Sequence, residues 1–304
     1  MKDAMNNQQP NASAHVAALL AQANSAAPPP DLRVQLLAAA NRTPSAADRV
    51  TPSSKIDVYA NQAADFHALA QTMTAEDWMK RAAPYQWSNH GLLAHTYVGE
   101  VYSAQIIGLP TEVGTVDGSH HLRMGSDIID AELLQSPSHT LGLWWERIQE
   151  TVSWLRSQPI EVGDQFTEYH GWPFPVEAVL VARGFELWTH ADDFRRSTGR
   201  PIDQPSVRDL RAMSSFSMQN LELILMLVHP NAPTGGARIV LTGPGGGTYT
   251  VGNPDERVVT AVVDVVDYCR VAADRLEPRD LVADIDGDRA ITDALWEASR
   301  TFAM

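Results

Sequence analysis

Apolar residues recur every three to four positions in four stretches of the chain, a spacing typical of amphipathic helices. These stretches cover residues 56–70, 88–98, 141–155 and 173–199. Ser88 or Asn89 suits the N-cap of the second helix. In the fourth, Pro173 or Pro175 suits the first turn and Gly199 follows the last. Helices joined by loops of variable length predict a four-helix bundle, in whose core facing side chains converge.

The pattern changes after Pro201. A helix is predicted over about 207–228, and two short β-rich runs follow it, 239–242 and 248–251. Because these runs flank the glycine-rich segment 243–247, they indicate a hairpin. The glycine run lacks the Gly-Lys-Ser/Thr ending of a phosphate-binding loop, so we reject a nucleotide site there.

Three further elements complete the C-terminal part. Residues 258–266 predict a strand that leads into a helix through Leu276, and 283–285 precede a last helix over 291–302. Strands and helices that alternate in this way predict a smaller α/β domain. Cys269, on the helical segment among valines, is expected to be a small core residue and not a nucleophile.

The N-terminal segment has a different pattern of apolar residues and prolines from the rest of the chain. Short helices are predicted around 16–23 and 32–40, on either side of the break Pro28-Pro29-Pro30, and such proline-rich breaks are typical of linkers. The segment is either a tail that packs on the body or a docking element. The overall prediction is an α+β fold in three parts. These are an extension over 1–54, a helix bundle over 55–200 and a small α/β domain over 201–304.

Composition and charge narrow the range of possible functions. The 304 residues are 44% hydrophobic and 20% charged, as in an ordinary soluble globular protein. The net charge of −14 argues against nucleic acid and anionic membranes as partners. One cysteine excludes an internal disulfide and a multi-cysteine zinc module. Because we also find no convincing signal peptide or apolar run of transmembrane length, we expect a cytoplasmic protein.

The fourth predicted helix carries candidate chemistry. Glu186 and His190 lie four residues apart, a spacing that places both side chains on one helix face, where one cation can contact both. His95, on the apolar side of the second helix, is the candidate third ligand. Two imidazoles and one carboxylate form the ligand set of a catalytic zinc site with one open position. Asp193 is placed to accept the other ring N–H of His190.

Each of these residues also has a simpler interpretation. Glu186 and His190 would then be a surface pair, worth a few tenths of a kcal/mol. His95 would be a core histidine bonded to a backbone carbonyl, and Asp193 a carboxylate facing water. The largely apolar surroundings of Glu186 favour the metal site, because a buried carboxylate needs a partner.

Two segments resemble the motifs of a known family. Residues 87–95, in which Trp87 precedes Leu-Leu-Ala-His95, resemble a "W…llaH" motif, and 185–193 with Gly199 resemble "E-x-x-x-H-x-x-D…G". Both motifs belong to the mycothiol-dependent maleylpyruvate isomerase family, within the DinB-like superfamily. The resemblance covers about 55–304 and implies a DinB-like four-helix bundle followed by that family's second domain.

The resemblance also implies a site. A divalent metal, usually zinc, would be bound by residues matching His95, Glu186 and His190, with a low-molecular-weight thiol as cosubstrate. The family's second domain supplies an arginine, for which Arg279 is the nearest match; it would clamp a substrate carboxylate at the interdomain cleft. The extension and the pair His120-His121 depart from the family pattern, and an exposed loop is the usual explanation of such a pair.

A zinc ion held by two neutral imidazoles and one carboxylate carries a net charge of +1, so a thiol entering the open position would be held as its thiolate. We therefore predict a zinc-dependent enzyme, or one using another divalent metal. It would use a mycothiol-type thiol for S-transfer or thiol-assisted isomerisation of a small electrophilic substrate.

Two alternatives remain open. One is a zinc-dependent hydrolase with Asp192 or His90 as its base, and the other is a non-catalytic metal or small-molecule binding protein. The sequence does not decide the substrate, the thiol, the choice among zinc, nickel and iron, or whether the chain forms a homodimer.

Overall fold

The computed structural model describes residues 50–118, 121–229, 235–253, 255 and 257–303. The predicted helices within 1–49 lie outside these residues. The described part combines helices with two sheets, as the α+β prediction requires. In that part, no helix combines the length and the hydropathy needed to cross a bilayer.

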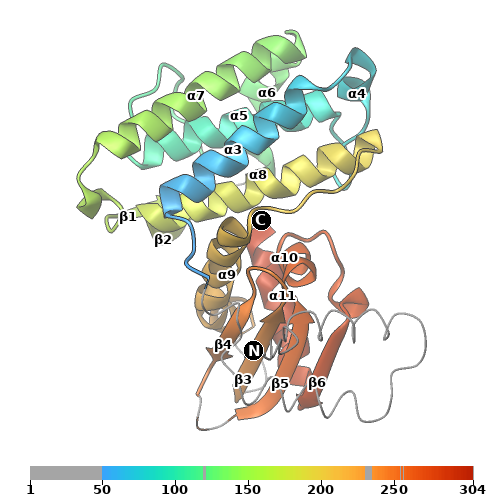
Figure 1. Cartoon of the computed structure of the whole chain (residues 1–304). Coiled ribbons are helices and arrows are strands. Elements are labelled where there is room, and N and C mark those ends of the chain that lie inside the picture. The colour runs from blue at the N-terminus through green and yellow to red at the C-terminus, as the bar shows by residue number, and fades with distance from the viewer. Residues whose placement is uncertain (1–49, 119–120, 230–234, 254, 256, 304) are drawn as a thin grey trace, which may run out of the picture. The chain divides into compact units, whose positions relative to one another are not determined.

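Four long helices of the first half lie side by side (Figure 1) and enclose one hydrophobic core. The helices of this half are α3 (Lys55–Gln71), α4 (Ala75–Met79), α5 (Asn89–Ile106), α6 (Ser126–Glu132), α7 (Pro137–Ser157) and α8 (Val176–Thr198), and the long ones are α3, α5, α7 and α8. The Ser88 hydroxyl accepts the Gly91 N–H at 3.2 Å, so the predicted cap of α5 is confirmed. α5 is buried without interruption from Asn89 to Ala104, which places its middle deep in the core.

The start of α8 differs from the prediction. Residues before it form a two-stranded antiparallel hairpin of β1 (Phe166–Tyr169) and β2 (Trp172–Pro175), with His170 and Gly171 in its turn. Pro173 therefore lies in a strand and not in a helical turn, and Pro175 is the N-cap of α8. Proline is compatible with a strand of this kind because an edge strand can do without its N–H group.

α8 separates two hydrophobic cores, because its apolar residues point in two directions. Leu187 and Phe194 pack into the core of the helical half. Phe185 and Trp188 pack into a second core, shared with the C-terminal half. Glu186 and His190 thus lie on a helix whose neighbouring faces are both covered by apolar side chains.

The C-terminal half contains a mixed sheet in the order β4-β3-β5-β6. Its elements are α9 (Val207–Val228), β3 (Gly236–Thr242), β4 (Gly247–Val251), β5 (Arg257–Asp264), α10 (Val265–Ala272), β6 (Ala283–Gly287) and α11 (Arg289–Ser299). β3 and β4 form the predicted hairpin, whereas β3 and β5 are parallel. The predicted strand over 258–266 ends earlier, because the Asp264 carboxylate accepts the N–H groups of Val266 and Asp267 and caps α10. α10 itself ends at Ala272, before the predicted Leu276.

Candidate metal centre

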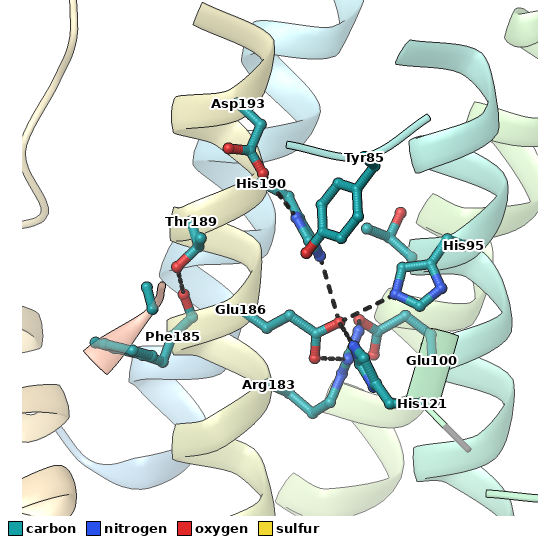
Figure 2. Close-up of polar contacts among 12 residues, drawn as sticks. Tyr85, His95, Glu100, His121, Arg183, Phe185, Glu186, Thr189, His190 and Asp193 are labelled. Carbon is teal, nitrogen blue, oxygen red and sulfur yellow. Dashed lines mark hydrogen bonds and ion pairs between the residues drawn. The ribbon is translucent and has the colours of Figure 1, made fainter. Parts of the chain in front are cut away.

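α8 and α5 bring three of the predicted residues together. The Nε2 atom of His190 lies 3.5 Å from Glu186 Oε1, and the Nε2 atom of His95 lies 3.7 Å from the same oxygen. One ligand atom from each residue lies within 4.8 Å of the other two (Figure 2). The side chains of His95 and His190 are 0% and 1% exposed, and that of Glu186 is 16% exposed. The Trp87 indole stacks on the His95 ring, with centroids 4.9 Å apart.

The atoms that face one another in this triad lack partners. Glu186 Oε1, His190 Nε2 and both ring nitrogens of His95 are buried without a hydrogen bond to any described residue. Unpaired buried polar atoms are costly, and native structures keep few of them. A cation bound between them would satisfy Glu186 Oε1, His190 Nε2 and one nitrogen of His95 at once, so the residues fit a divalent metal with imidazole and carboxylate ligands.

A buried ion pair holds the other oxygen of Glu186. Arg183 Nη1 donates to Glu186 Oε2, and Arg183 Nη2 donates to Glu100 Oε1 at 2.7 Å. The hydroxyl of Tyr59 donates to Glu100 Oε2 at 2.5 Å. Two carboxylates thus share one guanidinium, and burial raises the pKa of Glu100. The pKa of Glu186 is held low, so its charge favours a cation beside it.

The electrostatics of the ligands follow from burial and from these neighbours. Burial lowers the pKa of His95 well below its usual value, so the ring is neutral and free to act as a ligand. Burial alone would raise the pKa of Glu186, but the Arg183 guanidinium and His121 hold it well below its usual range. Burial opposes protonation of His190, but its contacts with Asp193 and Glu186 outweigh that effect and raise its pKa.

Asp193 lies where we expected a carboxylate that orients His190. Its Oδ2 is 3.2 Å from His190 Nδ1, which leaves His190 Nε2 directed at Glu186. Arg275 reaches Asp193 with two nitrogens, Nε to Oδ1 and Nη2 to Oδ2, both at 2.7 Å. Arg275 Nη2 also donates to the Tyr85 hydroxyl at 3.0 Å. The C-terminal half therefore supports a ligand of the helical half through one arginine.

Arg279, the predicted arginine, is exposed on the short turn Pro278–Asp280. Arg275, four residues earlier, is the one that makes the contact with Asp193. Helical or strand periodicity carries no signal for Arg275, because it follows the end of α10 and its partner is far away in the sequence.

His121 is a correction to the exposed loop expected for the His120-His121 pair. The side chain of His121 is 10% exposed, and its Nε2 lies 3.7 Å from Glu186 Oε1. Its ring meets that of His95 edge to face, with centroids 4.9 Å apart. The short turn His121–Arg123, between α5 and α6, thus brings a side chain to the triad, and sequence periodicity gives no signal for such a contact. His120 lies outside the described residues.

The two bases considered for a hydrolase are engaged elsewhere. His90 Nε2 lies 3.0 Å from the hydroxyl of Thr140, which in turn donates to Glu132. Asp192 forms an ion pair with Arg195 at 3.5 Å. These contacts argue against a hydrolase that uses His90 or Asp192 as its base.

No protein-family model and no curated protein matches the sequence. Among solved structures, the fold is similar to a crystal structure of mycothiol-dependent maleylpyruvate isomerase. The identity is 13% and the TM-score 0.54, over 76% of this chain and 91% of that one. A variant of that enzyme with one histidine replaced by alanine gives 12% identity and the same TM-score and coverage. The chain thus shares its fold with mycothiol-dependent maleylpyruvate isomerase.

Proposed function

We propose that this protein is a metal-dependent enzyme in which His95, Glu186 and His190 hold a divalent ion, most simply zinc. The observation that carries the proposal is the convergence of buried, unpaired ligand atoms from α5 and α8. With three protein ligands and one open position, the ion would lower the pKa of an incoming thiol and hold its thiolate at neutral pH.

The shared fold supports the choice of a thiol such as mycothiol as cosubstrate, because the similar solved enzyme is mycothiol-dependent. It also supports the reading of α3, α5, α7 and α8 as a DinB-like four-helix bundle. We propose the same three-part organisation as from the sequence, with an extension over 1–54, the bundle over 55–200 and an α/β domain over 201–304.

Each of the surrounding residues has its own role in the proposed reaction. Arg183 fixes Glu186 through one oxygen, and Asp193 fixes His190 through Nδ1. The thiol gives its proton to solvent, and its sulfur forms a C–S bond to one carbon of a C=C bond conjugated to a carbonyl, while the π electron pair moves to the carbonyl oxygen as an enolate. In a transfer the enolate takes up a proton and the C–S bond persists. In an isomerisation, rotation about the former C=C bond, now single, precedes return of the electron pair, which re-forms the C=C bond and releases the thiolate. Arg279 stays our candidate clamp for a substrate carboxylate, since its planar fork suits that group.

The first test is metal content, measured by elemental mass spectrometry on the parent and on Glu186→Ala and His190→Ala variants after zinc is supplied. We expect about one zinc ion per chain in the parent and little in the variants. His139→Ala is the matched control, because His139 is an exposed histidine of α7 and should leave the metal content unchanged. A parent that binds no zinc would overturn the proposal.

Turnover is tested separately with maleylpyruvate as the electrophile. We expect the zinc-loaded parent to consume it only when mycothiol is added. Equal turnover without any thiol would favour a hydrolase, and a zinc-loaded protein inactive with and without thiol would favour a binding protein.

A further inference from the structure

We propose that His121 is a fourth protein ligand of the metal and occupies the position that the triad leaves open. The inference rests on the proposed metal site and adds to it. It changes the expected chemistry, because a thiol must then replace an imidazole and does not enter an empty position.

The first argument is the arrangement of three imidazoles about one oxygen. The Nε2 atoms of His190, His95 and His121 lie 3.5, 3.7 and 3.7 Å from Glu186 Oε1 (Figure 2). These distances exceed the roughly 2.7–3.2 Å of an N–H···O hydrogen bond. They are close to the separation of about 3.3–3.4 Å between ligand atoms in a tetrahedral site with bonds of about 2.0–2.1 Å. Each imidazole thus lies at about the distance from Oε1 that two ligands of one ion have from each other, and His121 lies beside the three residues whose ligand atoms are all within 4.8 Å of one another.

The second argument is that no hydrogen bond to a residue in the described part of the chain accounts for the burial of His121. Its Nδ1 is buried without a hydrogen bond to any described residue. Nearby His170 differs, since its Nδ1 lies 2.8 Å from the Gly118 carbonyl oxygen. Of these two adjacent rings, His121 is the one whose Nε2 faces Glu186 Oε1, at 3.7 Å.

The third argument is that the loop carrying His121 is anchored on both sides. Before His121, the Gly118 carbonyl oxygen contacts His170, and the Gly118 backbone lies against the Tyr102 ring. After His121, Met124 is 2% exposed and belongs to the core of the helical half. Both contacts are made with parts of the structure outside the loop, so the surrounding fold determines the position of His121.

The proposal predicts competition between His121 and the thiol. If His121 leaves the ion about a tenth of the time, its removal should tighten thiol binding by roughly tenfold. The same removal should weaken metal binding, by at least the roughly 10–100-fold seen when groups that support a ligand are lost.

X-ray absorption spectroscopy on the zinc-loaded parent tests the coordination without any substitution. We expect scattering from three imidazoles. Two imidazoles with one or more waters would overturn the proposal and leave the three-residue site intact.

Cobalt(II) provides the variant test, because its visible absorption reports coordination. The His121→Ala variant should still bind cobalt, more weakly and with an altered spectrum that added imidazole returns to the parent form. His139→Ala should match the parent, and His95→Ala should lose the metal. If His121→Ala keeps the parent spectrum and affinity while His95→Ala loses binding, His121 is not a ligand. If the parent itself binds no cobalt and no zinc, the proposed function fails as well.

Discussion

The two oxygens of Glu186 meet different neighbours. Oε2 accepts a hydrogen bond from Arg183, whereas Oε1 faces the imidazole nitrogens of three histidines. The four-residue spacing to His190 could be predicted from the sequence, because it depends on one helix alone. The ion pair of Arg183 with Glu100 could not, since the partners lie on different helices, 83 residues apart. Apolar periodicity indicates which face of a helix is buried, but it does not identify the helix that packs against this face.

Replacing Arg183 by methionine should destabilise the metal-free protein by about 3–5 kcal/mol, because Glu100 and Glu186 would be left as buried charges without a cation. Zinc should restore part of this loss by neutralising Glu186. Urea unfolding of the metal-free and zinc-loaded forms measures both quantities. Adding Glu100→Gln to Arg183→Met removes one of the stranded charges and should recover stability. If the metal-free Arg183→Met variant were as stable as the metal-free parent, the contacts of Arg183 with Glu100 and Glu186 would not contribute this stability.

At the scale of elements, the sequence was sufficient to predict the bounds of a helix that has its own capping residue and its own row of apolar residues. α9 begins and ends at the predicted residues, and α5 begins after the predicted cap. The hairpin β1–β2 was missed because each strand has only four residues and β2 contains two prolines, which the sequence analysis assigned to a helix start. The position of His121 was missed because a loop packs by contacts distant in sequence, which no local pattern records.

Two helical glycines make a matched pair of tests. A Cβ on Gly99 of α5 would lie 2.8 Å from Nη2 of Arg183, whereas a Cβ on Gly142 of α7 would meet nothing within 4 Å. Gly142→Ala should therefore raise the free energy of unfolding by about 0.5–1 kcal/mol, the usual gain for alanine in a helix. Gly99→Ala should lose stability and bind zinc more weakly, because the guanidinium must move away from Glu186. Thermal unfolding and zinc titration check both, and equal gains in the two variants would contradict the close contact.

At the scale of the whole molecule, Arg275 connects the halves of the described chain. It comes from the segment after α10 and pairs with Asp193 on α8, and its guanidinium carbon lies 5.2 Å from the centre of the Tyr85 ring. Asp193 is fully buried, so its charge depends on this partner. The sequence shows a change of pattern after Pro201, but it gives no signal for the contact of Arg275 with Asp193.

Arg275→Ala should weaken zinc binding by about 10–100-fold, because Asp193 would no longer hold His190 in place. It should also cost about 3–5 kcal/mol of stability through the unpaired carboxylate. Arg279→Ala is the control, since an exposed arginine four residues away should change stability by no more than about 0.5 kcal/mol. Competition with a chelator of known affinity gives the zinc affinity, and equal values for the two variants would refute the role of Arg275.

The place of Arg275 in the chain bears on the order of events during synthesis. All the proposed ligands precede Asp193 in the sequence and leave the ribosome first, whereas Arg275 follows much later. A nascent chain that has reached α9 thus already displays the complete ligand set, but with its aspartate unsupported. Tight metal capture should accordingly follow folding of the C-terminal half, and half-made chains would exchange their metal readily with competing cellular ligands.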